Sequence, residues 1–433
     1  MRYIFIAIQL VLIFCSYGQS SLINKHPRVN EQRILERINS LAKFGRDSTG
    51  AGYRVAYSKG DLDGRSYIID LMKGAGLSVR IDFGGNIIGT RKGKDNSLKP
   101  ICFGSHTDMV PNGGNYDGCL GVISALEVIE TLNEQHIITN HPLEIIVFQN
   151  EEGGEIGSHI YLGHFNNSAL NEMSKSGLTI RQGIKALGGN TDSLDYAIQK
   201  PESKQAYLEL HIEQGGFLER DKINIGVVEG IVGIEEWEVI VEGLANHAGT
   251  TPMNNRKDGL LAASKLIIAC NEIVRSIPGN QVENVGKISV EPGAANVIPG
   301  KVSFNLEIRD LSKEKIFKLF NAIEKKGDTI SNQDGVKIYF KNLHMSSTPA
   351  LMNKNMQDII KTTATSLGLT YKVMQSGAGH DAQEMAGLAP TAMIFIPSIG
   401  GISHSPKEYS KPSDLANGAN VLLNSILKID GEK

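Results

Sequence analysis

The chain has 433 residues, 41% of them hydrophobic, so it can bury a large core, and its length predicts two or three domains. Its formal net charge is -3 and no block of like charges stands out, which excludes the basic face that a nucleic-acid partner requires. The expected partner is therefore a small-molecule ligand, with no nucleic acid.

An apolar run near the amino terminus is typical of a secretory signal. It extends from Tyr3 to Cys15, with one basic residue before it and the small residues Ser16 and Gly18 after it. The run is short for a membrane-spanning helix. We therefore predict a signal peptide at residues 1–18, no membrane span after its cleavage, and a periplasmic or secreted protein.

Helices alternate with short apolar strands along most of the chain. Helical periodicity marks residues 33–44 and 65–76. Apolar runs typical of buried strands cover 99–105, 143–152, 206–214 and 391–398. Apolar strands separated by helices favour an α/β fold, with a mostly parallel sheet that has helices on both faces. In such sheets the ligand lies beyond the carboxyl ends of the strands.

The pattern changes at about residue 233. Polar and apolar residues alternate in the segments 235–243, 286–293, 301–310 and 334–342, between helices predicted at 258–276 and 313–326. This favours an antiparallel sheet with helices on one face. We therefore predict an inserted α+β domain at 233–343 and a first domain that is split into 22–232 and 344–433.

Three residues of metal-binding type follow the strand predicted at 99–105, in the stretch "FGSHTDMVPNGGNYDGCLG". His106 and Asp108 project the same way if the chain stays extended, and the turn after them can bring Asp117 back to a helix that begins near Gly118. The alternative is that Asp117 only caps that helix and His106 is an ordinary strand-end histidine. This stretch alone leaves both interpretations open.

The adjacent carboxylates Glu151 and Glu152 close the apolar strand predicted at 143–152, which does not suit a solvated charged face. One carboxylate of such a pair can bind a metal while the other accepts a proton from metal-bound water. His211 ends another predicted strand, and His404 lies in a glycine-rich loop. Together these imidazoles and carboxylates suit two divalent ions that share a bridging carboxylate.

Eight motifs of the chain resemble those of a known family. In order and spacing, the chain resembles the two-metal amidohydrolase and peptidase family related to aminoacylases and bacterial carboxypeptidases. Within that family it is most similar to the branch of N-carbamoyl-L-amino acid hydrolases and allantoate amidohydrolases, over residues 30–430. The motifs are "GSHTDMVPNGGNYDG", "NEEGGEIG", "HIEQGGFLE", "ANHAGTTPMNNRKD", "GAANVIPG", "LEIRD", "SGAGHDA" and "GISHSPKE".

The resemblance implies two divalent metal ions per chain, either zinc, manganese, cobalt or nickel. His106 and His211 would hold one ion, Glu152 and His404 the other, and Asp117 would bridge them. These five residues are the metal ligands that we expect.

The resemblance also implies catalytic and substrate-binding residues. Glu151 corresponds to the general base, and Asp108 to the carboxylate that orients His106. His247 comes from the inserted domain, often across a dimer, and helps to polarise the scissile carbonyl. The residues that match substrate-binding positions are Gln214, Asn296 and Arg309. To these we add His380, in "GAGHDA", as a supporting substrate residue.

The chain departs from the branch after the double glutamate, where an arginine and a phenylalanine usually precede the next glycine. Here Glu155 and Ile156 precede Gly157, and His159 and His164 follow. This difference leaves the metal ligands intact but changes the adjacent pocket wall. We interpret His159 as a surface histidine rather than a ligand.

The expected activity is hydrolysis of a carbon–nitrogen bond in a ureido or amide substrate, such as an N-carbamoyl-L-amino acid or an allantoate-like ureido acid. The inserted domain at 233–343 would act as a lid and a homodimer interface for the catalytic domain. One alternative is an aminoacylase or metallo-exopeptidase of the same fold. Another is a secreted binding protein that has lost catalysis, against which the intact Glu151 weighs.

Overall fold

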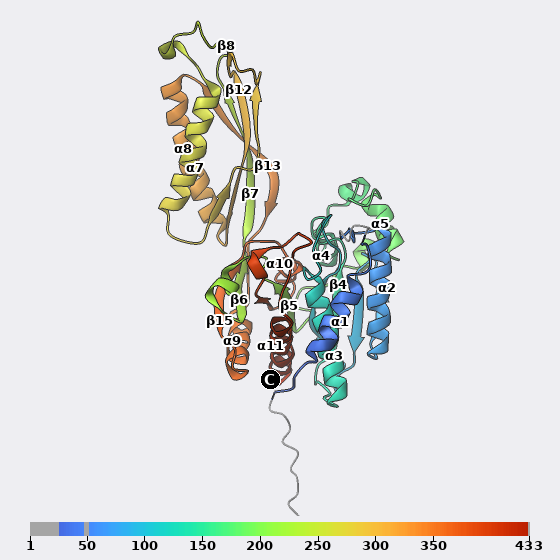
Figure 1. Cartoon of the computed structure of the whole chain (residues 1–433). Helices are drawn as coiled ribbons and strands as arrows, with labels where there is room; N and C mark the ends of the chain where they lie inside the picture. Colours follow the sequence, from blue (N-terminus) through green and yellow to red (C-terminus); the bar gives the residue numbers. More distant parts are fainter. Residues whose placement is uncertain (1–25, 47–51, 432–433) are drawn as a thin grey trace, which may run out of the picture.

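The computed structural model describes residues 26–46 and 52–431, and the signal peptide predicted at 1–18 lies outside these ranges. Figure 1 shows two bodies, each built on its own β-sheet. The chain crosses between the bodies twice, once between Ile231 and Gly233 and once between Ser347 and Ala350. The second body stands away from the first and is joined to it by these two crossings (Figure 1).

The first body contains a nine-stranded sheet in the order β1-β2-β4-β3-β5-β16-β6-β14, with β15 beside β6. The central strands β4, β3, β5 and β16 are parallel, and only β2, β6 and β15 run the opposite way. The bounds are β1 Ser78–Ile81, β2 Ile87–Arg91, β3 Ile101–His106, β4 Leu143–Phe148, β5 Ala206–Ile212, β6 Ile225–Ile231, β14 Ala350–Leu351, β15 Tyr371–Ser376 and β16 Thr391–Ile396. The mostly parallel sheet predicted from the sequence is thereby confirmed.

Helices cover both faces of this sheet. Along β3, Ile101 and Phe103 pack into the core beneath one set of helices, whereas Cys102 packs into the core on the opposite face. The first set is α1 Glu31–Leu41, α2 Lys59–Gly74, α3 Cys119–Glu134, α9 Lys354–Ser366 and α11 Pro412–Gly431. The opposite face carries α4 Ile156–Leu162, α6 Phe217–Asp221 and α10 Asp381–Met385. A further helix, α5 Ile180–Ala186, belongs to a separate small core at the margin.

The second body has a five-stranded antiparallel sheet in the order β10-β12-β7-β13, with β9 beside β12. Buried and less buried residues alternate along β7 and β12, because two helices cover only one face. The bounds are β7 Gly233–Glu242, β9 Val282–Asn284, β10 Ile288–Glu291, β12 Lys301–Asp310, β13 Lys337–Ser347, α7 Gly259–Ser276 and α8 Lys313–Asp334. The strand β13 continues past the domain boundary predicted at residue 343.

A two-stranded sheet of β8 Asn246–His247 and β11 Val297–Ile298 lies at the end of the second body farthest from the first (Figure 1). Local sequence fixes the direction of the long helices below it. The Asp258 side chain accepts the backbone N–H groups of Leu260 and Leu261 and so caps α7, and the Ser312 hydroxyl accepts an N–H group of α8.

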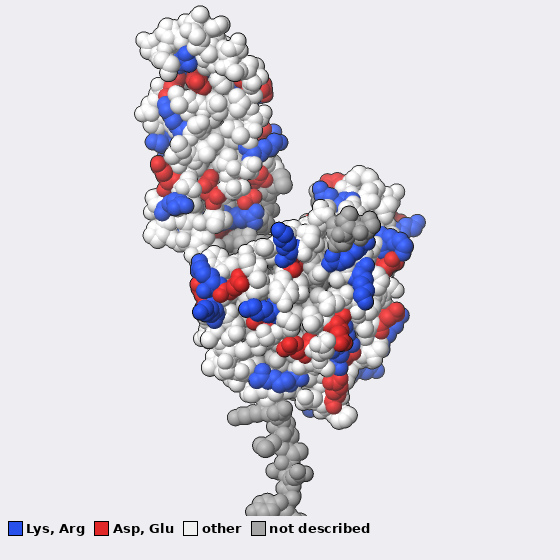
Figure 2. Space-filling view, in the orientation of Figure 1, with Lys and Arg blue, Asp and Glu red and all other residues white. Residues whose placement is uncertain are grey.

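The surface carries both signs of charge. Figure 2 shows lysine and arginine interspersed with aspartate and glutamate over the visible face of both bodies. Among the described residues, no helix combines the length and the apolar character that crossing a bilayer requires.

The core of the second body depends on an aromatic stack. The rings of Trp237 and Phe320 lie parallel with their centroids 4.1 Å apart, and Trp237 is the only tryptophan in the chain. Its fluorescence therefore reports the state of this body alone.

We expect Phe320→Ala to destabilise the second body by about 3 to 5 kcal/mol, because it removes a buried ring and leaves a cavity. Chemical denaturation followed by Trp237 fluorescence measures the change. Tyr339→Ala, at a residue that is 45% exposed on β13, is the control and should change stability by only about 0.5 kcal/mol. Equal shifts for the two variants would show that the stack does not stabilise the core.

Candidate metal centre and active site

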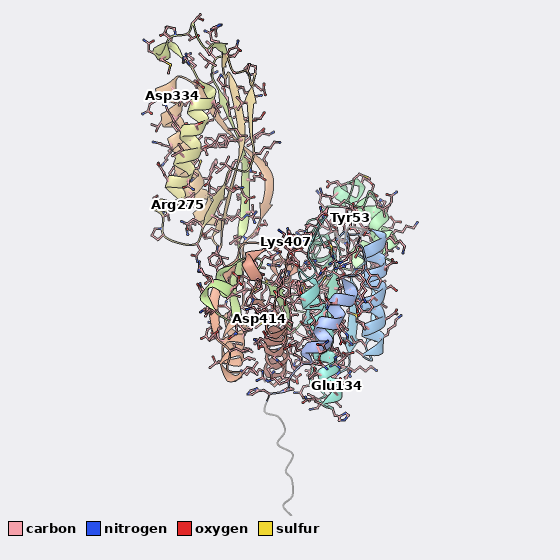
Figure 3. The ribbon with its side chains drawn as sticks, in the orientation of Figure 1. Tyr53, Glu134, Arg275, Asp334, Lys407 and Asp414 are labelled. Atoms are coloured by element: carbon pink, nitrogen blue, oxygen red, sulfur yellow. The ribbon has the colours of Figure 1, made fainter. Side chains whose placement is uncertain are left out.

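The parallel strands β3, β4, β5 and β16 end at one edge of the sheet, and the predicted metal ligands gather there. His106 ends β3, Glu151 and Glu152 follow β4, His211 is near the end of β5, and His404 follows β16. Figure 3 shows Lys407, from the loop that carries His404, on the side of the first body that faces the second body. Strand topology therefore brings four distant chain segments to one place.

Asp117 lies at the centre of the cluster. Its Oδ1 is 3.5 Å from Nε2 of His106 and 3.1 Å from Nε2 of His211. Its Oδ2 is 3.2 Å from Nε2 of His404, which is in turn 3.6 Å from the Glu152 carboxylate. The two oxygens of one carboxylate thus face two different sets of ligand atoms.

The electrostatics of these groups reflect their crowding. Burial alone would raise the pKa of Asp117, but hydrogen bonds from the three surrounding imidazoles hold that pKa well below its usual range. Burial, reinforced by the charge of Asp117, raises the pKa of Glu152 to about 7. The hydrogen bond with Asp117 raises the pKa of His404 to about 9. Negative charge is therefore concentrated here and stabilises any cation that enters.

The donor set fits divalent metal ions. Two groups of side chains, His106–Asp117–His211 and Asp117–Glu152–His404, each bring their ligand atoms within 4.8 Å of one another. Oε1 of Glu152 is buried and has no hydrogen-bond partner among the described residues, so one lone pair in the second group is left for a ligand. Imidazole and carboxylate are the ligands that zinc, manganese, cobalt and nickel accept.

The alternative interpretation of Asp117 as a helix cap is wrong. The N-cap of α3 is Gly118, and no side chain makes a capping hydrogen bond there. Gly118 has a φ of 63°, and a Cβ at this position would collide with the ring of His106. Only glycine therefore allows the chain to place Asp117 and His106 side by side.

Asp108 holds the turn that carries the glutamate pair. Its two carboxylate oxygens accept the backbone N–H groups of Glu151, at 3.3 Å, and of Glu152, at 3.2 Å. Nδ1 of His106 lies 3.1 Å from the Asp108 carbonyl oxygen and 3.6 Å from its carboxylate. Asp108 therefore positions both the histidine and the glutamate turn.

Glu151 lies beside the ligands, with its carboxylate 3.6 Å from Nε2 of His106. Burial raises the pKa of Glu151 well above its usual range, and the nearby imidazole opposes this shift only in part. A carboxylate of high pKa next to a metal cluster is suited to accept a proton.

Two of the predicted substrate-binding residues lie close to the cluster. Nε2 of Gln214 donates a hydrogen bond to Oδ2 of Asp117 at 2.8 Å. His380 is only 1% exposed, and its ring meets that of His211 edge-on with centroids 4.5 Å apart. Burial behind His211 favours a positioning role for His380 over direct contact with a substrate.

The remaining predicted residues belong to the second body and are separated along it. His247 and Asn296 are exposed neighbours on the small sheet, where Ala248 N donates to Asn296 O at 3.0 Å. Arg309 lies at the other end, where it bonds Glu307 at 2.6 Å and the carbonyl oxygen of Gly377 at 2.8 Å. Among the described residues, no hydrogen bond or ion pair joins His247 to the metal ligands.

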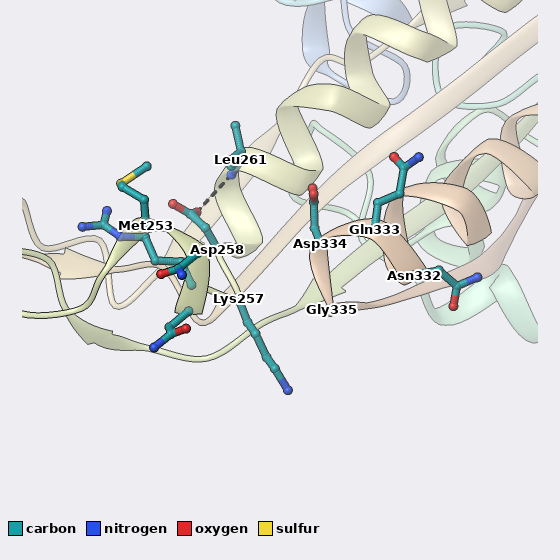
Figure 4. A pocket seen from close by; sticks show the side chains of 11 residues that line it. Met253, Lys257, Asp258, Leu261, Asn332, Gln333, Asp334 and Gly335 are labelled. Atoms are coloured by element: carbon teal, nitrogen blue, oxygen red, sulfur yellow. Dashed lines mark hydrogen bonds between the residues drawn. The ribbon is translucent and has the colours of Figure 1, made fainter.

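The chain that follows His247 also lines a pocket of about 480 Å³ between the start of α7 and the end of α8 (Figure 4). Lys257, Asp258 and Asp334 are among its lining residues, and Asp258 is engaged in capping α7. This pocket contains none of the predicted metal ligands.

Sequence reasoning missed two residues that hold the cluster. Oε1 of Glu408 accepts the backbone N–H groups of Tyr116, at 2.8 Å, and of Asp117, at 3.1 Å. Arg54 is fully buried, and its Nε donates to the carbonyl oxygen of Thr107 at 2.7 Å. Glu408 lies within the motif "GISHSPKE", but Arg54 has no local signal.

The chain is similar to known amidohydrolases along nearly its whole length. The model of Peptidase family M20/M25/M40 matches residues 102–428. An N-carbamoyl-L-amino acid amidohydrolase from Geobacillus stearothermophilus is 35% identical over 93% of this chain and 99% of the relative, and the allantoate amidohydrolase of Escherichia coli (strain K12) is 33% identical over 93% and 98%. The crystal structure of an amidase of the hydantoinase/carbamoylase family from Burkholderia multivorans superposes with a TM-score of 0.87, at 33% identity over 94% of this chain and 99% of that one. The chain therefore belongs to Peptidase family M20/M25/M40.

Proposed function

We propose that this protein is a metal-dependent hydrolase that cleaves a non-peptide carbon–nitrogen bond of a ureido or amide substrate. The observation that carries the proposal is Asp117, whose two oxygens face separate ligand sets beside the carboxylate of Glu151. Relatives that match nearly the whole chain are named for N-carbamoyl-L-amino acids and allantoate. We propose an N-carbamoyl-L-amino acid or an allantoate-like ureido acid as the substrate.

Enzymes of this family use divalent metals, and we propose two ions per chain, zinc, manganese, cobalt or nickel. His106 and His211 would hold one ion, Glu152 and His404 would hold the other, and Asp117 would be shared by the two groups. When bound, such ions polarise the substrate carbonyl and make water a stronger acid.

Glu151 then acts as the general base. Its position 3.6 Å from Nε2 of His106 puts it next to the ligand set, and its raised pKa favours acceptance of a proton from the attacking water. The same carboxyl group can return that proton to the leaving nitrogen. Asp108 keeps Glu151 in place through its backbone N–H group.

Geometry supports a homodimer in which the partner supplies His247 and Asn296. The ten residues of β12 extend for about 30 Å, and His247 lies beyond one end of this strand while Arg309 is at the other end, near the crossings. Glu155 and Ser347 line one pocket next to those crossings, and Glu155 is three residues, about 10 Å at most, from the metal ligand Glu152. When the second body swings about the crossings, His247 stays at least the length of β12 away from them. The metal ligands of the same chain lie closer to the crossings than that, so the swing does not bring His247 to them.

We propose that His247 from the partner subunit hydrogen-bonds the oxyanion that forms on the substrate. Asn296 lies beside His247 and would enter the same site.

Arg309 already points its guanidinium at the carbonyl oxygen of Gly377 and at Glu307. A substrate carboxylate that replaces Glu307 would form the bidentate pair typical of arginine, with Gln214 as a further polar contact.

We also propose that the protein is exported to the periplasm or secreted. The proposal rests on the apolar run from Tyr3 to Cys15 and the small residues after it. Amino-terminal sequencing of the mature protein tests this proposal.

The first prediction that follows from the proposed function concerns Glu408. Glu408→Ala should weaken metal binding about 10- to 100-fold, because it frees the backbone at Asp117 and leaves two buried N–H groups without an acceptor. Metal content after dialysis against a chelator measures this loss. Glu408→Gln keeps an acceptor oxygen and should retain most of the affinity. Normal metal content in the alanine variant would show that Glu408 does not support metal binding.

The second prediction tests the reaction itself. Purified metal-replete protein should hydrolyse N-carbamoyl-L-amino acids or allantoate faster than acetyl amino acids or dipeptides. Glu151→Gln should lower turnover about 10²- to 10⁴-fold with unchanged metal content, because the amide keeps the shape but cannot accept the proton.

Asp63→Asn, at an exposed aspartate on α2, is the control and should leave turnover unchanged. Faster cleavage of dipeptides than of ureido compounds would replace the proposed substrate class. Near-normal turnover of Glu151→Gln would show that another group acts as the base.

The third prediction tests the partner's contribution. His247→Ala should keep its metal content and lose turnover, because the histidine is remote from the metal ligands of its own chain. Mixing His247→Ala with Glu151→Gln should restore part of the activity, since a hybrid dimer has one site with both groups intact. If activity stays absent after mass spectrometry has verified subunit exchange, His247 does not act across a dimer.

A further inference from the structure

A second convergence of imidazoles and carboxylates lies outside the Asp117 cluster. Glu155 is the N-cap residue of α4, His159 lies on that helix, His164 follows it, and Glu384 lies on α10. Nε2 of His159 is 3.4 Å from one oxygen of Glu384, and Nδ1 of His164 is 2.7 Å from the other. Ligand atoms of Glu155, His159 and Glu384 all lie within 4.8 Å of one another.

The spacing of these atoms suits a metal ion. Two ligands at about 2.1 Å from a tetrahedral ion are about 3.4 Å apart, which equals the separation of Nε2 of His159 from Glu384. Glu155 precedes α4 in the left-handed conformation, with a φ of 54°, and this turn places its carboxylate near His159 of the same helix. Gly379 leaves room for the Glu155 carboxylate, because a Cβ there would collide with it.

The ring of His159 is oriented as a metal ligand requires. Its Nδ1 lies 3.1 Å from the carbonyl oxygen of Gly154, and donation of the Nδ1 proton leaves the lone pair of the neutral ring on Nε2. That lone pair then faces the carboxylate of Glu384. Two acceptors that face each other need a cation between them, either a proton on His159 or a metal ion.

A protonated His159 would attract the Glu155 carboxylate through space but would make no hydrogen bond to it. Such a proton satisfies the contact with Glu384, and His164 satisfies the second oxygen of Glu384. Among the described residues, however, no donor makes a hydrogen bond or an ion pair with the Glu155 carboxylate. A metal ion satisfies all three side chains together.

We propose that Glu155, His159 and Glu384 bind a divalent cation, for which zinc is the best match, at a site separate from the Asp117 cluster. His164, whose side chain is 58% exposed, is the fourth ligand once the ion separates it from Glu384. Four imidazole and carboxylate ligands without an open position form a structural site rather than a catalytic one.

Solvent reaches this site from the junction of the two bodies. Glu155, His159, His164 and Glu384 line a pocket of about 960 Å³ whose other walls include Glu236 and Glu307 of the second body. Glu307 is paired with Arg309, so Glu236 supplies the additional negative charge that attracts cations to the pocket. The bound ion would tie α4, which follows the Glu151–Glu152 turn, to α10, which follows His380.

Metal analysis of the full chain tests the proposal. His159→Ala and Glu384→Gln should each bind one equivalent of zinc less than the wild-type protein after dialysis against zinc-containing buffer. His26→Ala and Glu324→Gln, at residues outside both clusters, are the matched controls and should bind as much zinc as the wild type. Circular dichroism and gel filtration verify that each variant is folded.

A second measurement isolates the site from the proposed catalytic ions. The double variant His106→Ala/His404→Ala should still bind one equivalent of zinc in a calorimetric titration, and the addition of Glu384→Gln should abolish that binding. Wild-type zinc content in both His159→Ala and Glu384→Gln would overturn the proposal and leave an ordinary ion pair. The zinc count does not depend on turnover, so failure of the proposed activity leaves this test unaffected.

Discussion

The burial of several carboxylates around Asp117 is the constraint on which the rest of the site depends. Asp117 is 6% exposed, and burial of a charged carboxylate is costly unless opposite charges or hydrogen bonds offset it. Three imidazoles lie around its carboxylate, Glu408 accepts its backbone N–H group, and Gly118 follows it in the chain. Because these groups come from segments after β3, β4, β5 and β16, the cluster exists only when the parallel sheet is assembled.

The two bodies contribute different residues to the proposed reaction. The sheet edge of the first body is rigid and holds the charged ligands, since each strand there is fixed by two neighbours. The second body presents His247 and Asn296 at its far end and Arg309 at its near end, separated by the length of β12. A stiff strand cannot bring both ends to one cluster, so the proposed chemistry depends on association of two subunits as much as on the fold of one.

Elements with strong local periodicity could be predicted from the sequence alone. The strand predicted at 301–310 is β12, because its strict alternation of apolar and polar residues matches a sheet covered on one face. The strand predicted at 143–152 ends earlier, at Phe148, because Asn150 adopts a φ of 53° and turns the chain toward the glutamate pair. Contacts between distant segments left no such signal. Glu408 reaches Asp117 across 291 positions, and periodicity carries no information about such a pair.

The same distinction explains why His159 was interpreted as a surface residue. Its partner Glu384 comes from another helix, and only the fold brings the two within 3.4 Å. The resemblance implies an arginine where this chain has Glu155, and an arginine there would neutralise Glu384 without any ion. Replacement of that cation by a carboxylate reverses the local charge, so the neighbouring histidines or a metal ion must supply the missing positive charge. Glu155, His159, His164 and Glu384 therefore form one local balance of charge that the fold assembles.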